Sequence, residues 1–143
     1  MTQSALEGRL RGALRMGAAS IFVMTPVELA LAEHVQSPIQ LFPLIASGLG
    51  LVGVVCSRWA GTASRRVASS AFVLVCLVGV LGMWEHFEHN FAFEQEIHPT
   101  LATTPAALGA LFGASPALAP GILILGAALA WASMLGTRTR ARS

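Results

Sequence analysis

The chain has 143 residues, of which 55% are hydrophobic and 11% are charged, and its mean hydropathy is +0.68. A soluble domain carries about 25% charged residues, so this composition excludes an ordinary soluble domain and favours a chain that lies in a lipid bilayer. The basic residues are nine arginines beside apolar stretches, where arginine orients membrane helices and meets anionic lipid. We therefore expect no nucleic-acid partner.

Charged residues alternate along the chain between arginine-rich and acidic segments. The arginines fall within residues 9–15, 58–66 and 138–142, while every histidine and every carboxylate except Glu7 lies between these groups. Because short arginine-rich segments stay in the cytoplasm, the alternation predicts four crossings with both termini inside and the acidic segments outside. The expected location is a bacterial-type cytoplasmic (inner) membrane.

Four apolar stretches match the hydrocarbon core, which is roughly 30 Å thick. They predict crossings over residues 16–35, 39–56, 67–84 and 116–135. An outer segment, residues 85–114, contains Thr104-Pro105, a pair typical of a helix start, and so predicts a short helix from about residue 105 to 113. The expected fold is a single all-α domain, an integral membrane four-helix bundle with an extra interfacial helix on the outer side.

The N-terminus also allows a second interpretation. Arg9 and Arg15 precede an apolar run that ends near Ala30-Leu31-Ala32, which fits the A-x-A pattern of a signal-peptide cleavage site. In that case residues 1–32 would be removed. The full spanning length of the run, and Glu28 close to it, favour a retained crossing.

Two glycine patterns raise a choice between ligand binding and helix packing. Gly48, Gly50 and Gly53 match the dinucleotide-binding pattern, which requires a preceding strand. These residues lie within a predicted crossing, where glycines let helices approach closely. We therefore expect Gly50 and Gly53 to mediate packing, and Gly109 and Gly113 to do the same outside the bilayer.

Glutamates and histidines gather at the predicted outer ends of the first and third crossings. Glu85 and His89 are four residues apart, on the helix face opposite Trp84 and Phe87. Carboxylate and imidazole groups bind iron, zinc and manganese, and imidazole also binds copper. The sequence therefore predicts candidate metal ligands, namely Glu28, Glu33, His34, Glu85, His86, Glu88 and His89. The competing interpretation is a hydrated acidic surface with interfacial histidines.

The identity of a cofactor stays open. Di-iron sites in helical bundles use Glu-x-x-His motifs, and this chain has none. Haem b between His34 and either His86 or His89 is geometrically conceivable, because all three lie at predicted outer ends of crossings. A transition metal (Fe, Zn or Cu) and haem b are thus the two alternatives.

Glu28 lies inside an apolar stretch, where an ionisable group costs about 2.5–3.5 kcal/mol on insertion scales. We expect it to face the bundle and to be the most function-sensitive carboxylate. A lone glutamate in the first of four helices resembles the small multidrug transporters, which would imply proton-coupled transport. The nearly complete charge bias and the long excursion over residues 85–104 depart from that family.

The sequence offers no self-contained catalytic set, so we do not expect an enzyme that acts alone. The predicted function is a small membrane subunit or accessory protein that presents an acidic Glu/His outer surface to a metal, a cofactor or a larger complex. Its expected partners are lipid and either other membrane subunits or further copies of the chain. The alternatives are a proton-coupled transporter using Glu28 and a haem b-binding membrane anchor.

Overall fold

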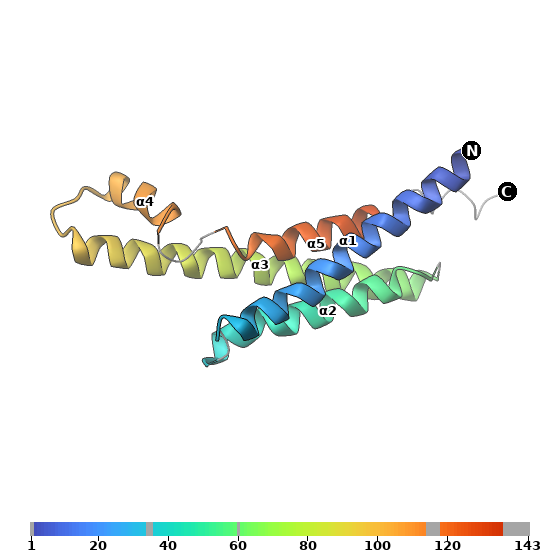
Figure 1. Ribbon diagram of the computed structural model, residues 1–143, viewed down its shortest axis with the longest axis horizontal. Coiled ribbons are helices and arrows are strands. Elements are labelled where there is room, and N and C mark those ends of the chain that lie inside the picture. The colour runs from blue at the N-terminus through green and yellow to red at the C-terminus, as the bar shows by residue number, and fades with distance from the viewer. Residues whose placement is uncertain (1, 34–35, 60, 114–117, 136–143) are drawn as a thin grey trace.

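The fold is entirely helical in the part of the chain that the computed structural model describes, residues 2–33, 36–59, 61–113 and 118–135. Its elements are α1 (Gln3–Leu31), the 3-10 turn η1 (Pro38–Leu41), α2 (Phe42–Cys56), α3 (Thr62–Ile97), α4 (Thr103–Leu111) and α5 (Gly121–Ala132). Helices α1, α2, α3 and α5 pack together, while α4 lies apart against the far end of α3 (Figure 1). The predicted all-α class is confirmed.

Three helical segments are long and apolar enough to cross a membrane, namely Gln3–Leu31, Pro38–Cys56 and Thr62–Ile97. The second agrees with the stretch predicted over residues 39–56. Helix α5 has 12 residues, or about 18 Å at 1.5 Å per residue, and by itself is shorter than the bilayer core. Part of the stretch predicted over 116–135 lies outside the described residues, so a fourth crossing stays a prediction.

Helix α1 differs from its predicted bounds at both ends. It begins at Gln3, well before the expected start at residue 16, and it ends at Leu31. The end is set by Glu33, whose φ of 55° places it in the left-handed region that residues following a helix often adopt. The apolar stretch therefore outlasts the helix, and its last two predicted residues, 34–35, lie outside the described chain.

Helix α3 is much longer than the crossing predicted over residues 67–84. Its 36 residues span about 54 Å, which exceeds the hydrocarbon core by about 24 Å. No proline interrupts it, and it ends just before Pro99, where His98 has left the helical region with φ −130° and ψ 69°. The residues beyond Trp84 therefore form one rigid continuation of the helix.

Helix α4 packs back against this continuation of α3. The side chain of Asn90 is 3% exposed, and its Nδ2 donates a hydrogen bond to the carbonyl of Ala110 at 2.9 Å. A Cβ on Gly109 would lie 3.1 Å from the carboxyl carbon of Glu94, and one on Gly113 would lie 2.5 Å from Cγ of Asn90. The close approach predicted for both glycines is confirmed, although the helix begins at Thr103 and ends at Leu111.

The core of the bundle consists of aromatic rings seated on glycines. Phe22 of α1 and Phe72 of α3 are fully buried. A Cβ on Gly50 would lie 2.6 Å from Cζ of Phe22, and one on Gly53 would lie 2.5 Å from Cε1 of Phe72. The packing role predicted for these two glycines is confirmed, because only a residue without a side chain leaves room for the rings.

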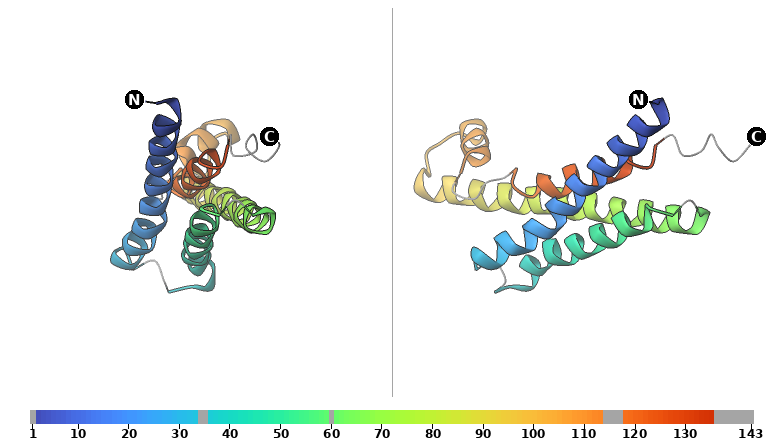
Figure 2. Two further views of the ribbon diagram at one scale, coloured as in Figure 1. Left: turned by 90° about the vertical axis from the view of Figure 1, so that its right-hand side faces the viewer. Right: turned by 45° about the vertical axis from the view of Figure 1, so that its right-hand side comes forward.

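The pair α1–α2 and the pair α3–α5 repeat one pattern. Five residues of α1 recur in α3 at the same spacing, namely Arg15, Ala18, Ser20, Phe22 and Val23 as Arg65, Ala68, Ser70, Phe72 and Val73. Helices α2 and α5 touch each other, whereas α1 and α3 share no contact in the described residues, as the end-on view in Figure 2 illustrates. The two pairs thus share a sequence pattern in their first helices and contact each other through α2 and α5.

In each pair, an arginine of the first helix caps the C-terminal end of the second helix. The last carbonyls of a helix have no partner within it, and a nearby cation stabilises them. Nη2 of Arg15 donates to the carbonyl of Ser57 at the end of α2, at 3.0 Å. Nη2 of Arg65 donates to the carbonyl of Met134 just after α5, at 3.2 Å. We call this part of the molecule, with Arg15, Arg58 and Arg65, the arginine end.

Candidate functional site

The opposite end of the bundle carries the carboxylates and imidazoles, and we call it the Glu/His end after Glu33, Glu85, His86, Glu88 and His89. The continuation of α3 is amphipathic there, as predicted. The rings of Trp84 and Phe87 have centroids 6.1 Å apart, and those of Phe87 and Phe91 are stacked at 6.0 Å. Glu85, Glu88 and His89 are exposed on the rest of the helix.

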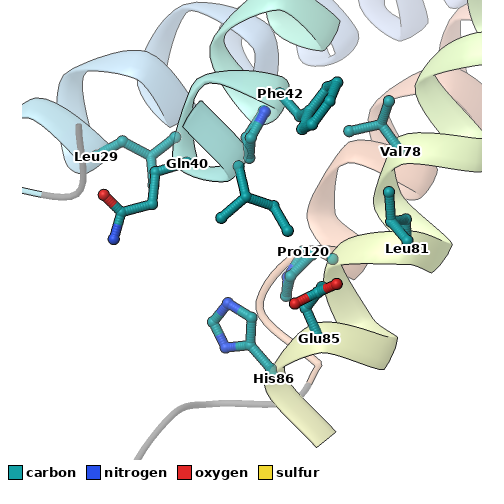
Figure 3. A pocket seen from close by; sticks show the side chains of 11 residues that line it. Leu29, Gln40, Phe42, Val78, Leu81, Glu85, His86 and Pro120 are labelled. Carbon is teal, nitrogen blue, oxygen red and sulfur yellow. The ribbon is translucent and has the colours of Figure 1, made fainter. Parts of the chain in front are cut away.

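A cavity of about 110 Å³ lies at this end, between α1, the η1–α2 segment, α3 and the residue before α5. Its walls are mostly apolar, and polar groups come from Gln40, Glu85 and His86. Figure 3 shows Glu85 and His86 beside Pro120, with Gln40 and Leu29 across the cavity. The cavity therefore combines an apolar interior with a carboxylate and an imidazole from consecutive residues of α3.

Gln40 also fixes the turn that forms one wall of the cavity. Its Oε1 accepts hydrogen bonds from the backbone N–H groups of Gln36, at 2.8 Å, and Ser37, at 3.1 Å. Ser37 and Gln40 together form a capping box, and Pro38 occupies the first position of η1, where its missing N–H costs nothing. This local network fixes the turn that leads into α2.

The predicted metal ligands do not gather around one point in the described part of the chain. Glu28, Glu33, Glu85, Glu88 and His89 are exposed and His86 is half-buried. Within those residues, no three histidine, cysteine or carboxylate side chains lie close enough to hold one ion. Glu85 and His86 share the cavity. His34 lies outside the described residues, so the metal site and the haem b site that includes His34 stay predictions.

Glu28 corrects one expectation of the sequence. It is exposed on the surface of α1 and does not face the bundle, so the predicted orientation is wrong. Its neighbour Leu29 lines the same cavity as Glu85, which places Glu28 near the Glu/His end and one helical turn from the end of α1. A carboxylate this close to the interface can reach water, as long charged side chains near helix ends do.

The positions of charged residues in the sequence do not identify two polar residues of this region, Gln40 and Asn90. Gln40 carries a local signal, since Ser-x-x-Gln before an apolar run is the pattern of a capping box. Asn90 has a weaker one, because it lies next to Phe91 on the side of α3 where aromatic residues cluster. Only the fold reveals that α4 covers it.

The charge pattern gives the two ends of the bundle opposite signs. Glu7, the carboxylate that breaks the arginine segregation, forms an exposed ion pair with Arg11 at 3.7 Å and so adds no separate acidic site. Every arginine of the described residues belongs to the arginine end or to the first turns of α1 beyond it.

The chain matches no protein-family model, no curated protein and no solved structure.

Proposed function

We propose that the chain is an integral membrane protein with four crossings and both termini in the cytoplasm, and that it serves as a non-catalytic subunit or accessory protein. The three apolar helices of spanning length support the membrane location. The segregation of arginine from glutamate and histidine supports the orientation, with the arginine end in the cytoplasm. In this arrangement α5 and its apolar neighbours supply the fourth crossing.

The observation that carries the proposal is the projection formed by the continuation of α3 and by α4. The continuation of α3 beyond Trp84, residues 85–97, is about 20 Å long, and α4 is fastened to it through Asn90. Helix α4 contains no charged residue. Leu108 and Leu111 within it and Phe112 directly after it are exposed, Phe112 to 88%. An exposed apolar patch of this kind marks a contact with a protein or with the membrane surface, and we infer the first. The partner proposed here is therefore another protein on the outer side.

The orientation has a direct test by cysteine labelling. In a background with Cys56→Ala and Cys76→Ala, Ser37→Cys and Thr100→Cys are expected to react with a membrane-impermeant maleimide in intact cells. Thr62→Cys is expected to react only after the membrane is opened, because the proposal places it in the cytoplasm. Labelling of Thr62→Cys alone in intact cells would reverse the orientation and remove the basis for an outer partner.

The docking role is tested by a photo-crosslinking residue at Phe112. We expect a discrete protein adduct in intact cells, and we expect Phe112→Ser to reduce recovery of the same protein with the chain. The matched control is Leu77, which is 60% exposed on the crossing part of α3 and is expected to yield lipid adducts. Lipid adducts alone from both positions would contradict docking through α4.

Neither alternative function gains a specific observation from the described residues. Exposure of Glu28 near a helix end removes the burial that suggested proton-coupled transport. The histidine that a haem b anchor would require from α1, His34, lies outside the described chain. We therefore keep the subunit proposal as the function that the geometry supports best.

A further inference from the structure

The cavity at the Glu/His end has the size and lining of a binding site for a small apolar group. Its volume of about 110 Å³ is somewhat smaller than the about 150 Å³ of an engineered cavity that holds benzene, so a small ring or short alkyl chain would lie partly in the cavity and partly in its opening. The apolar wall is formed by six residues, namely Leu29, Ile39, Phe42, Pro43, Val78 and Leu81. An apolar group would gain free energy by leaving water for this space.

The cavity has a floor and a side opening. Pro120 closes it next to Gly82, where a Cβ would lie only 2.9 Å from the Cβ of the proline, so glycine is what lets the two segments meet. Ile39, Phe42 and Leu81 line it and are each nearly half exposed. They flank an opening between the η1–α2 segment and α3. A molecule dissolved in the bilayer can therefore enter from the side.

The charge at the rim decides which kind of molecule fits. Glu85 is the one carboxylate in the lining, and the described arginines lie at the other end of the bundle. Arg65, on the same helix, is about 30 Å away along the axis. Glu28, next to the lining residue Leu29, and Glu33 after the end of α1 add negative charge to this end of the bundle. A cationic group is thus favoured beside Glu85, and an anionic one is repelled.

We propose that this cavity binds an ammonium group attached to an apolar ring or chain. The apolar part occupies the space between α2 and α3, and the nitrogen lies beside the carboxylate of Glu85 as a charge-assisted hydrogen-bond donor. The same chemistry is supplied by a lipid with an amine headgroup, such as phosphatidylethanolamine, and by a free amphiphilic amine. Neither source depends on the protein partner proposed above.

The test compares matched cationic and uncharged probes on the full chain in a maltoside detergent. Benzylamine is a cation at neutral pH and benzyl alcohol has the same ring without the charge. Isothermal titration is expected to give at least about fivefold tighter binding of benzylamine, a preference that corresponds to one charge-assisted contact. For the lipid source, native mass spectrometry compares phosphatidylethanolamine with phosphatidylglycerol of identical acyl chains.

Glu85→Gln keeps the shape of the side chain and removes its charge, and it is expected to abolish the preference for benzylamine. Glu88→Gln is the control, because Glu88 is an exposed glutamate on the same helix that does not line the cavity. Selective retention of phosphatidylethanolamine that Glu85→Gln removes identifies a lipid, and a benzylamine preference without it identifies a free amine. Equal binding of the two ring probes together with equal retention of the two lipids overturns the proposal. An equal effect of Glu85→Gln and Glu88→Gln on the preference for benzylamine overturns it as well.

Discussion

Replacing Gly50 with leucine is expected to destabilise the bundle by about 1–3 kcal/mol or more, because overpacking a filled core forces side chains or helices apart. The Cβ alone would lie 2.6 Å from Cζ of Phe22, a ring that is fully buried and has no space into which to move. The measurement is thermal unfolding of the purified chain in mild detergent. A lower unfolding temperature and loss of the monodisperse species are the expected results.

The control for this experiment lies two residues earlier in the same helix. A Cβ on Gly48 would meet nothing within 4 Å, so Gly48→Leu is expected to change the free energy of unfolding by less than about 0.5 kcal/mol. A second check is compensation, since Phe22→Leu should recover part of the stability lost in Gly50→Ala by removing the ring that the methyl group meets. Equal effects at Gly48 and Gly50 would show that the ring-on-glycine contact does not hold α1 to α2.

Asn90→Leu is expected to release α4 from α3 while leaving the crossing helices folded. Leucine has nearly the shape of asparagine, but it cannot donate to the carbonyl of Ala110, which would stay buried without this donor. Loss of one such hydrogen bond costs about 0.5–1.5 kcal/mol, since the carbonyl of Ala110 also accepts from the N–H of Gly113. Hydrogen exchange should therefore speed up through Thr103–Leu111 and stay unchanged in α2, and the docking of a partner through Phe112 should weaken with it.

Gln95→Leu is the matched control for that substitution. Gln95 is exposed on the same continuation of α3, so its replacement removes an amide without uncovering a buried group. Exchange in α4 should stay as slow as in the wild-type chain. If Asn90→Leu left exchange in α4 unchanged, the hydrogen bond to Ala110 would not be what fastens the helix.

Local patterns in the sequence predicted the parts of the fold that depend on near neighbours. The glycines of α2, the aromatic face around Phe87 and the second apolar helix all follow from spacing along one helix. The amphipathic pattern from Trp84 to Phe91 predicted that this helix continues past the crossing, but the full length of α3 did not follow from it, since the helix runs on to Ile97. Charged and aromatic residues can continue a helix as readily as they form a loop, and hydropathy does not distinguish the two.

The site required information that no single segment holds. The cavity joins residues from α1, η1, α2 and α3 with Pro120, which are brought together only by packing. The orientation of Glu28 was also missed, since the face of α1 that packs on the bundle depends on the other helices, and the side chain of Glu28 is exposed. Glu85 and His86 were singled out from residue type, but the apolar space beside them was not predicted.

The repeated pattern of α1–α2 and α3–α5 also suggests how such a chain can originate. Each pair offers the other a matching surface, which is the condition for a symmetric homodimer of a half-length hairpin. Duplication and fusion of one hairpin would give this bundle directly, with Arg15 and Arg65 as descendants of one ancestral capping residue. The continuation of α3 and α4 has no counterpart in the first pair. By this descent it is the later addition, and it brings Glu85, His86, Glu88 and His89 to an end of the bundle to which the first pair contributes Glu33.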